Sequence, residues 1–212
     1  MSKYKHILWD WNGTLLDDTW LSVDIINQLL AKYAKPLISL ETYREIFDFP
    51  VINYYSRLGF DFTQTPFKMV GAEYIHQYFN RWRECRLREN AREALEFISH
   101  ARIRQSILSA ASQALIQEGV QYFCISDFFM ELAGLDNNYA PGKKDIAGHL
   151  MRRIAADPQH ILLIGDTTHD HEVAKEIGMD CILLTGGHHS VEKLRLCRVP
   201  LIDSLAQLRE VL

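Results

Sequence analysis

Long apolar runs, long basic runs and paired cysteines are all missing from this sequence of 212 residues. A membrane-spanning helix needs about 18 consecutive apolar residues, and no stretch of the chain approaches that length. A nucleic-acid surface needs a basic patch, whereas this chain has 23 Lys and Arg against 27 Asp and Glu, for a formal net charge of -4. We therefore expect neither a membrane protein nor a nucleic-acid-binding protein.

The cysteines indicate a reducing compartment. There are four, without paired spacing: Cys85, Cys124, Cys181 and Cys197. This pattern is typical of reduced thiols and not of a disulfide framework. The N-terminal segment reaches Asp10 before any apolar stretch of signal-peptide length develops. We expect a cytoplasmic protein, and the sequence leaves both a monomer and a homodimer open.

The chain divides into two kinds of segment. A short apolar strand is followed by helical patterns alone over residues 18–88. From there to the end, strands alternate with helices, which is typical of a parallel sheet covered on both faces. The sequence therefore predicts an α/β fold with a doubly wound, Rossmann-like core domain, residues 1–17 and 89–212, and an inserted all-helical cap domain, residues 18–88.

Apolar spacing and capping residues locate the individual elements. Asn90 and Glu93 have the spacing of a capping box and predict a helix from there through Ile98. The predicted core strands are 7–9, 103–109, 129–133, 161–165, 181–185 and 200–202. The other predicted core helices are 112–123, 143–155, 170–177 and 204–211. In the cap, helical spacing recurs over 21–33, 42–47, 50–58 and 70–82.

Polar residues that suit catalysis follow several of these strands. Carboxyl ends of strands in open α/β sheets meet at one edge, where ligands bind. A carboxylate there is a nucleophile, a metal ligand or both, although the segment 6–18 taken alone could be an ordinary strand and turn. In chain order, the residues are Asp10 after the first strand, Ser109 at the end of the strand 103–109, the pair Lys143-Lys144, and Asp166 and Asp170 after the strand 161–165.

As an ordered set, these motifs resemble the four motifs of the haloacid dehalogenase superfamily of phosphotransferases. The resemblance covers most of the chain and is nearest to the phosphoglycolate-phosphatase-like branch, which has a helical cap. It implies a magnesium-dependent hydrolase that acts on a small phosphorylated metabolite through an aspartyl-phosphate intermediate.

The resemblance also implies roles for individual residues. Asp10 would attack the phosphoryl group. Asp10, Asp166 and the backbone carbonyl of Asn12 would hold Mg2+, which prefers hard oxygen ligands. Asp170 would bind a metal-ligated water or hold the catalytic lysine, and it would also suit the start of the helix 170–177.

The phosphate-binding residues come from two other motifs. Ser109, with backbone N–H groups near Ala110, would bind the phosphoryl oxygens, and Ser112 would cap the next helix. Lys143 would neutralise the phosphate and the nucleophile. Lys144 is the alternative, but the lead-in Ala-Pro-Gly before Lys143 favours Lys143.

Asn12 departs from the family pattern, because phosphatases of this superfamily usually carry a second Asp there as general acid and base. An amide cannot exchange a proton at neutral pH, and general acid-base catalysis typically contributes about 100-fold to 10,000-fold. Three interpretations stay open. The protein is a phosphatase that is slower or uses a good leaving group, a hydrolase of carbon–phosphorus bonds, or a phospholigand-binding, regulatory protein.

Two further groups of residues allow more than one interpretation. The segments His169-Asp170-His171 and His188-His189 suggest zinc, but the residues flanking Asp170 would point to different sides, so we expect no zinc site there. His188 is expected close to the site, in a loop that closes it. The cap residues Phe47, Phe49, Tyr54, Tyr55, Arg44 and Arg57 could contact substrate, although helical spacing favours the aromatic ones as the core of the cap.

Overall fold

The computed structural model describes residues 2–135 and 143–212, apart from the side chains of residues 144 and 145. Within these residues, six parallel strands form one sheet in the order β5-β4-β1-β6-β7-β8. Their bounds are β1 His6–Trp9, β4 Arg104–Ser112, β5 Glu131–Leu135, β6 Ile161–Gly165, β7 Asp180–Leu184 and β8 Leu201–Ile202. The strand order changes direction at β1, which is the arrangement of a doubly wound sheet.

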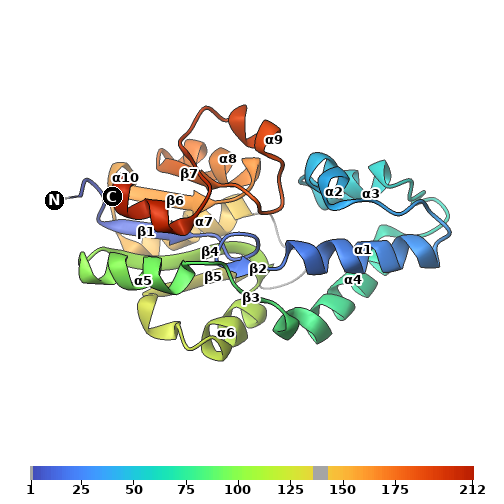
Figure 1. Ribbon diagram of the computed structural model, residues 1–212, viewed down its shortest axis with the longest axis horizontal. Coiled ribbons are helices and arrows are strands. Elements are labelled where there is room, and N and C mark those ends of the chain that lie inside the picture. Colours follow the sequence, from blue (N-terminus) through green and yellow to red (C-terminus); the bar gives the residue numbers. More distant parts are fainter. Residues whose placement is uncertain (1, 136–142) are drawn as a thin grey trace.

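Helices cover both faces of this sheet (Figure 1). Side chains of β1 alternate between two cores, because successive residues of a strand point to opposite faces. Ile7 and Trp9 pack with α5 (Ala91–His100) and α6 (Gln113–Tyr122), whereas Leu8 packs with α7 (Lys143–Ile154) and α8 (Thr168–Ile177). The shorter helices of the core are α9 Val191–Arg195, α10 Leu208–Val211, and the 3-10 helices η2 Ser126–Phe128, η3 Pro158–His160 and η4 Leu205–Gln207. A further 3-10 helix, η1 Trp82–Glu84, follows the last helix of the segment 18–88.

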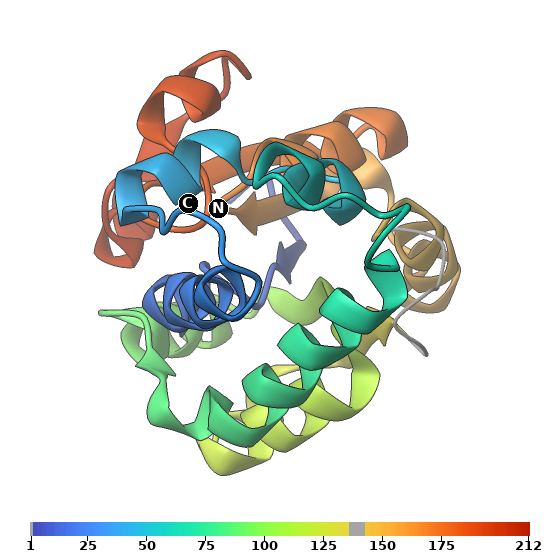
Figure 2. The same ribbon diagram turned by 90° about the vertical axis from the view of Figure 1, so that its right-hand side faces the viewer.

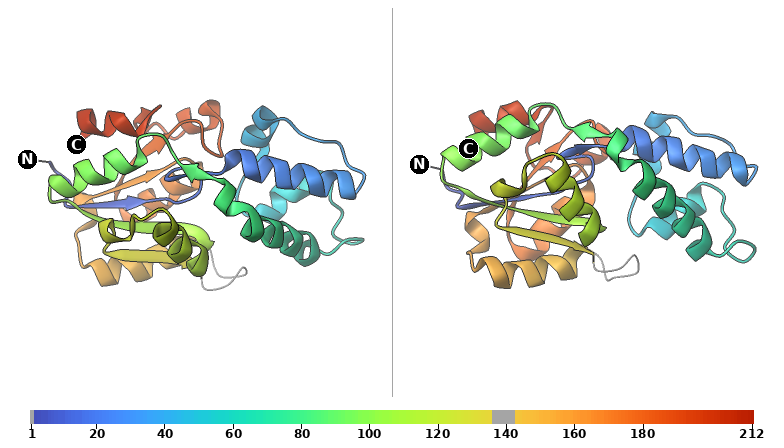
Figure 3. Two further views of the ribbon diagram at one scale, coloured as in Figure 1. Left: turned by 60° about the horizontal axis from the view of Figure 1, so that its bottom comes forward. Right: turned by 90° about the horizontal axis from the view of Figure 1, so that it is seen from below.

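Four further helices lie beyond the carboxyl ends of the strands and have a hydrophobic core of their own. They are α1 Thr19–Lys32, α2 Leu40–Ile46, α3 Val51–Arg57 and α4 Phe67–Arg81. Figures 2 and 3 show this cap in front of, and to one side of, the sheet. The chain enters and leaves it through an antiparallel pair, β2 (Leu16–Asp17) and β3 (Arg86–Leu87).

The fold class is confirmed: the core is a parallel α/β sheet with a helical cap. The cap limits, residues 18 and 88, stay a prediction. Two local expectations are wrong. The segment 18–88 is not free of strand, because Arg86 and Leu87 pair with the residues that enter the cap.

The predicted capping box at Asn90 is also wrong. Asn90 adopts a left-handed backbone conformation with φ 61°, and its side chain makes no capping bond but donates to Ser204 Oγ at 3.2 Å. The helix itself, α5, forms one residue later. All four cysteines are free. In the part of the chain that the structure describes, no helix is long and apolar enough to cross a membrane.

Candidate active site

The candidate site lies at the carboxyl ends of β1, β4 and β6, where the strand order changes direction. Asp10 directly follows β1, and its backbone N–H donates to the carbonyl of Ile164 on β6 at 2.9 Å. Asp166 directly follows β6. The two acids therefore sit side by side because their strands are neighbours in the sheet.

Three buried carboxylates form the centre of this site. Asp10, Asp166 and Asp170 are 7%, 0% and 0% exposed, and they offer ligand atoms that all lie within 4.8 Å of one another. Burial raises the pKa of Asp10 to about 7, against the lowering effect of Lys143. Burial also raises the pKa of Asp166 to about 6, although the charge of His188 lowers it. Clustered acids with raised pKa values are typical of functional sites.

Lys143, the first residue of α7, is the cation of the cluster. Its Nζ lies 2.8 Å from Asp10 Oδ1 and also donates to Asp170 Oδ1. The side chain is 2% exposed. Burial alone would lower the pKa of Lys143, but the carboxylates of Asp10 and Asp170 raise it, so that the ammonium stays charged. The side chain of Lys144, the alternative, and the lead-in at 140–142 lie outside the described part of the chain.

Asp170 contacts the lysine and also caps the start of α8, which begins two residues before the predicted position 170, at Thr168. While Oδ1 accepts from Lys143, Oδ2 accepts from the Thr167 N–H at 3.0 Å and from its hydroxyl at 2.7 Å. Burial would raise the pKa of Asp170, but the charge of Lys143 and these hydrogen bonds hold it below its usual value.

Two hydrogen-bond donors hold the side chain of Asp166, and two glycines leave the space that it occupies. The hydroxyl of Thr14 donates to Oδ1 at 2.8 Å, and the His188 N–H donates to Oδ2 at 2.6 Å. A Cβ atom at Gly13 or at Gly187 would lie 2.2 Å from Asp166 Oδ2. Gly13 also has φ +70°, a conformation that glycine adopts at low cost. The loop after β1 and the loop after β7 can therefore approach Asp166 only because both carry glycine here.

Ser109 lies on β4, the neighbour of β1, and is 1% exposed. The strand does not end there as predicted but continues to Ser112, with a shift of its pairing to β5 between Leu108 and Ser112. Ser109 Oγ accepts from the Ala111 N–H at 3.2 Å, and the half-buried Ala110 lies between them. Ser112 caps α6 as expected, accepting from the Leu115 N–H at 3.3 Å.

Asn12 is half-buried, and its side chain points to residues that the sequence did not single out. Its Nδ2 donates to Asp18 Oδ2 and to the hydroxyl of Tyr78, each at 2.7 Å. Asp18 occupies the N-cap position of α1, but its side chain makes no capping bond. An acid at this position is typical of a helix cap, whereas Asp18 here bonds to side chains that include Tyr78, 60 residues away.

His188 joins the same group from the loop after β7. Its Nε2 lies 3.3 Å from Asp18 Oδ1, and its Nδ1 lies 2.8 Å from the hydroxyl of Tyr43 on α2. Burial would lower the pKa of His188, but the carboxylate of Asp18 raises it to about 9. Burial would raise the pKa of Asp18, and the charge of His188 holds it below its usual value. The two residues form a buried ion pair between core and cap.

His169 and His189 have partners of their own. The ring of His169 lies 4.9 Å from that of Phe49, between ring centres, and His189 Nδ1 accepts from the Thr168 N–H at 3.1 Å. Among the described residues, the one group of side chains placed to bind a metal consists of the three aspartates and contains no histidine.

The cap aromatic residues divide into two groups. Tyr54 and Tyr55 belong to the core of the cap, as helical spacing indicates. Phe47 also lies against the site loop, with its ring centre 5.5 Å from that of His188. Arg44 holds the same loop by donating to the carbonyls of Gly186 and Gly187 at 2.7 and 2.9 Å.

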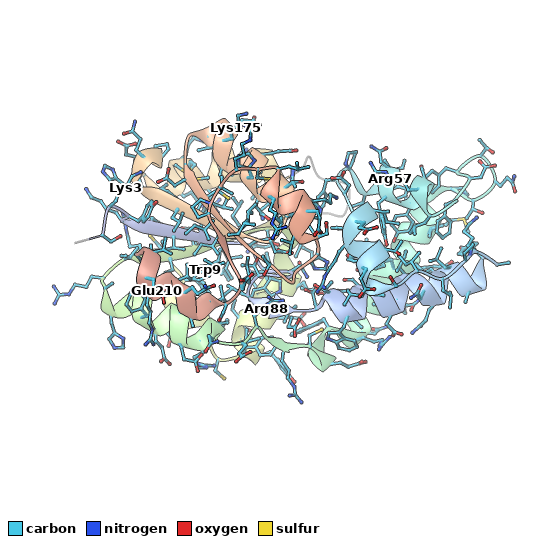
Figure 4. The ribbon with its side chains drawn as sticks, turned by 45° about the horizontal axis from the view of Figure 1, so that its top comes forward. Lys3, Trp9, Arg57, Arg88, Lys175 and Glu210 are labelled. Carbon is cyan, nitrogen blue, oxygen red and sulfur yellow. The ribbon has the colours of Figure 1, made fainter. Side chains whose placement is uncertain are left out.

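The segment that leaves the cap after β3 contributes a second arginine to this loop. Arg88, which Figure 4 places between the core and the cap, donates to the carbonyls of Thr185 and Gly186 at 2.8 and 3.0 Å. Arg57 lies at the top of the cap in the same figure and donates to the Ile46 carbonyl at 3.1 Å. The loop is therefore held by two arginines, one from the cap helix α2 and one from the segment that connects the cap to the core.

The fold and site define a capped, doubly wound α/β protein with buried carboxylates at its switch point. Residues 7–184 match the model of the haloacid dehalogenase-like hydrolase family. The chain belongs to this family, which confirms the resemblance inferred from its motifs.

Solved structures of similar proteins share the fold along the whole chain. A haloacid dehalogenase-like hydrolase from Streptococcus pneumoniae has a TM-score of 0.87 at 19% identity, over 100% of this chain and 99% of that one. A predicted phosphoglycolate phosphatase from Haemophilus somnus has a TM-score of 0.81 at 20% identity, again over 100% and 99%. CbbY from Rhodobacter sphaeroides, solved in complex with phosphate, has a TM-score of 0.73 at 20% identity, over 97% and 96%.

Curated relatives match over a shorter stretch. The tyrosine-protein kinase PtkA of Mycobacterium tuberculosis is 22% identical over 116 residues, which are 53% of this chain and 40% of that protein. The match thus spans less than half the length of this relative.

Proposed function

We propose that this protein is a magnesium-dependent phosphatase that hydrolyses a small-molecule phosphomonoester through an aspartyl-phosphate on Asp10. The observation that carries the proposal is the buried cluster of three carboxylates around one buried lysine. With all three acids ionised, the cluster has an excess of negative charge, which is costly in a buried place unless a cation compensates it.

The donor set fits Mg2+, which prefers a few carboxylates together with water and substrate phosphate. Asp10, Asp166 and the backbone carbonyl of Asn12 would hold the ion. When bound, the ion would reduce the repulsion between an anionic nucleophile and an anionic phosphate.

The residues of the chain would then perform two displacements. A carboxylate oxygen of Asp10 attacks phosphorus, and the bond from phosphorus to the leaving oxygen breaks. Water attacks phosphorus in the second displacement and releases phosphate and the Asp10 carboxylate. Lys143 keeps the Asp10 carboxylate in place through both steps, and Ser109 with the N–H groups around Ala110 would bind phosphoryl oxygens.

The cap would exclude bulk water while these steps proceed. Asn12 has no proton to transfer, so the leaving group departs as an anion or takes its proton from water. This favours phosphate esters whose leaving groups have a low pKa.

Asn12 also supports two other candidates: a phospholigand-binding protein that has lost turnover, and a hydrolase of carbon–phosphorus bonds. Phosphate release from a panel of phosphomonoesters, with magnesium and with chelator, separates these functions. Phosphoglycolate comes first in the panel because of the name of the Haemophilus somnus relative. We expect turnover that falls about 100-fold or more with chelator.

Tight binding of phosphate mimics without release from any ester would instead support the binding protein. Release from phosphonates alone would support cleavage of carbon–phosphorus bonds. The cytoplasmic location and the choice between monomer and homodimer stay predictions.

Magnesium should also stabilise the folded protein, more strongly at high pH than at low pH. The raised pKa values of Asp10, about 7, and Asp166, about 6, mean that the folded protein binds protons there which the unfolded chain has lost. These two groups therefore stabilise the metal-free protein at low pH, and their contribution disappears as pH rises through about 7. Ion binding needs the ionised carboxylates.

Thermal unfolding with magnesium and with chelator tests this expectation. At about pH 8, an ion concentration of roughly 100 times its dissociation constant should raise Tm by about 5 to 10 °C. At about pH 5 the rise should be less than half of that. Equal shifts at the two pH values would show that the ion binds elsewhere.

A further inference from the structure

Asp18 is a buried carboxylate that the proposed reaction does not use. It is 1% exposed and precedes α1 at the junction of core and cap. Its Oδ1 accepts from the Gly13 N–H at 2.8 Å and faces His188 Nε2 at 3.3 Å. Its Oδ2 accepts from Asn12 Nδ2 at 2.7 Å and from the Tyr78 hydroxyl at 2.6 Å. Asp18 thus contacts the loop of the nucleophile, the loop after β7 and the cap helix α4.

Asn12, Asp18 and Tyr78 form a closed triangle of hydrogen bonds. The third side joins Asn12 Nδ2 to the Tyr78 hydroxyl at 2.7 Å. A carboxylate only accepts hydrogen bonds, so the amide must turn its nitrogen, and not its oxygen, toward Asp18. Asn12 then donates twice, Asp18 Oδ2 accepts twice, and Tyr78 accepts once and donates once. Each of the three protons in the triangle has an acceptor.

We propose that Asp18 is a positioning residue that acts on the substrate through Asn12. Together with Tyr78, it occupies both amide hydrogens of Asn12, which leaves only the acceptor Oδ1 for substrate or water. The inference rests on the proposed phosphatase function and narrows it, because residue 12 can neither protonate the leaving oxygen nor donate a hydrogen bond to it. Residues 12 and 18 therefore form a matched pair of an amide and a carboxylate. We expect the protein to tolerate a swap of the two side chains better than the substitution of Asn12 alone.

The single substitution Asn12→Asp breaks this match. It places a half-buried carboxylate within hydrogen-bonding distance of the buried Asp18, and the one proton left in the triangle, that of Tyr78, can serve only one of the two. Two carboxylates at this distance destabilise the fold, either by their repulsion or because one of them must take up a proton at neutral pH. A loss of activity in this variant would thus report a mispaired site and not the chemistry of an acid at position 12.

The exchange Asn12→Asp/Asp18→Asn restores the match. The amide at position 18 keeps its oxygen toward the Gly13 N–H and turns its nitrogen toward position 12 and Tyr78. The Tyr78 hydroxyl then donates to the carboxylate at position 12. The three partners of the triangle are unchanged, and all three of its hydrogen bonds reverse their direction. His188 Nε2 then faces an amide oxygen in place of the Asp18 carboxylate.

The test compares Tm, kcat and KM for the wild type, Asn12→Asp, Asp18→Asn and the double variant. Asn12→Asp should lower Tm by on the order of 10 °C and lower kcat at least about tenfold. The double variant should recover at least half of the Tm that Asn12→Asp loses, because the triangle is satisfied again although His188 loses its charged partner. Its kcat should return to within about threefold of the wild type or exceed it, with a smaller change in KM.

Gln28→Glu is the matched control, because Gln28 Nε2 donates to Asp24 Oδ2 at 2.9 Å on the exposed side of α1. There a second carboxylate should change Tm by less than about 2 °C. A double variant no better than Asn12→Asp in Tm or kcat would overturn the proposal. A wild type that releases no phosphate would refute the proposed function. Because Tm is measured without substrate, the Tm values alone would then decide whether residues 12 and 18 form a matched pair.

Discussion

Asp10→Asn is expected to lower phosphate release at least about 10,000-fold, to the rate of a protein-free blank. The amide that replaces the carboxylate is a poor nucleophile and would be a poor ligand for the ion. The exchange keeps the size and shape of the side chain, and Lys143 still has Asp170 as a charged partner. The variant should therefore fold, and its circular dichroism should match that of the wild type.

Asp127→Asn provides the matched control for this variant. Asp127 is exposed, in η2 on the core domain. The same change of charge there should leave kcat within about twofold of the wild type. Phosphate release by a folded Asp10→Asn variant at more than about a tenth of the wild-type rate would show that another residue is the nucleophile.

Lys143→Met is expected to impair both folding and turnover. It removes the cation that touches Asp10 and Asp170, and leaves buried carboxylates without compensation. Breaking a buried ion pair by removing one partner typically costs about 3 to 5 kcal/mol, which for a chain of this size lowers Tm by roughly 10 °C or more. Turnover should fall at least about 100-fold, because the phosphate and the nucleophile lose their shared positive charge.

Thermal unfolding and phosphate release should be measured together for this variant. Lys175→Met is the control, since Lys175 is an exposed residue on α8 (Figure 4), and its loss should change Tm by less than about 2 °C. Magnesium should recover part of the stability of Lys143→Met, because the ion supplies positive charge to the same carboxylates. A variant as stable and as active as the wild type would contradict the role of Lys143.

The residues at strand ends could be predicted from sequence because a parallel sheet brings its carboxyl ends together. Asp10 and Asp166 each follow a short apolar run, and β1 and β6 proved to be neighbours. The order of the motifs along the chain identified Lys143 as a further site residue, and in the structure its Nζ contacts Asp10. The roles of these residues in catalysis stay predictions, whereas the fold and the family are confirmed.

The contacts around Asn12 could not be predicted in the same way, because they join distant parts of the chain. Asp18 and Tyr78 are 60 residues apart, and Tyr43 and His188 are 145 residues apart. Tyr78 has the spacing of a residue on the buried face of an amphipathic helix, and nothing local distinguishes its hydroxyl. An acid before an apolar helix is typical of an N-cap, which conceals the role of Asp18 at the junction of core and cap.

Trapping of the phosphoryl group on the protein is the most direct test of nucleophilic catalysis by Asp10. Wild-type protein turning over an active ester with magnesium would be quenched in acid, digested and mapped by mass spectrometry. The mechanism predicts one phosphoryl group on the peptide that contains Asp10, absent in Asp10→Asn and without substrate. Sustained hydrolysis with that peptide unmodified, or with the phosphoryl group on another residue, would contradict it.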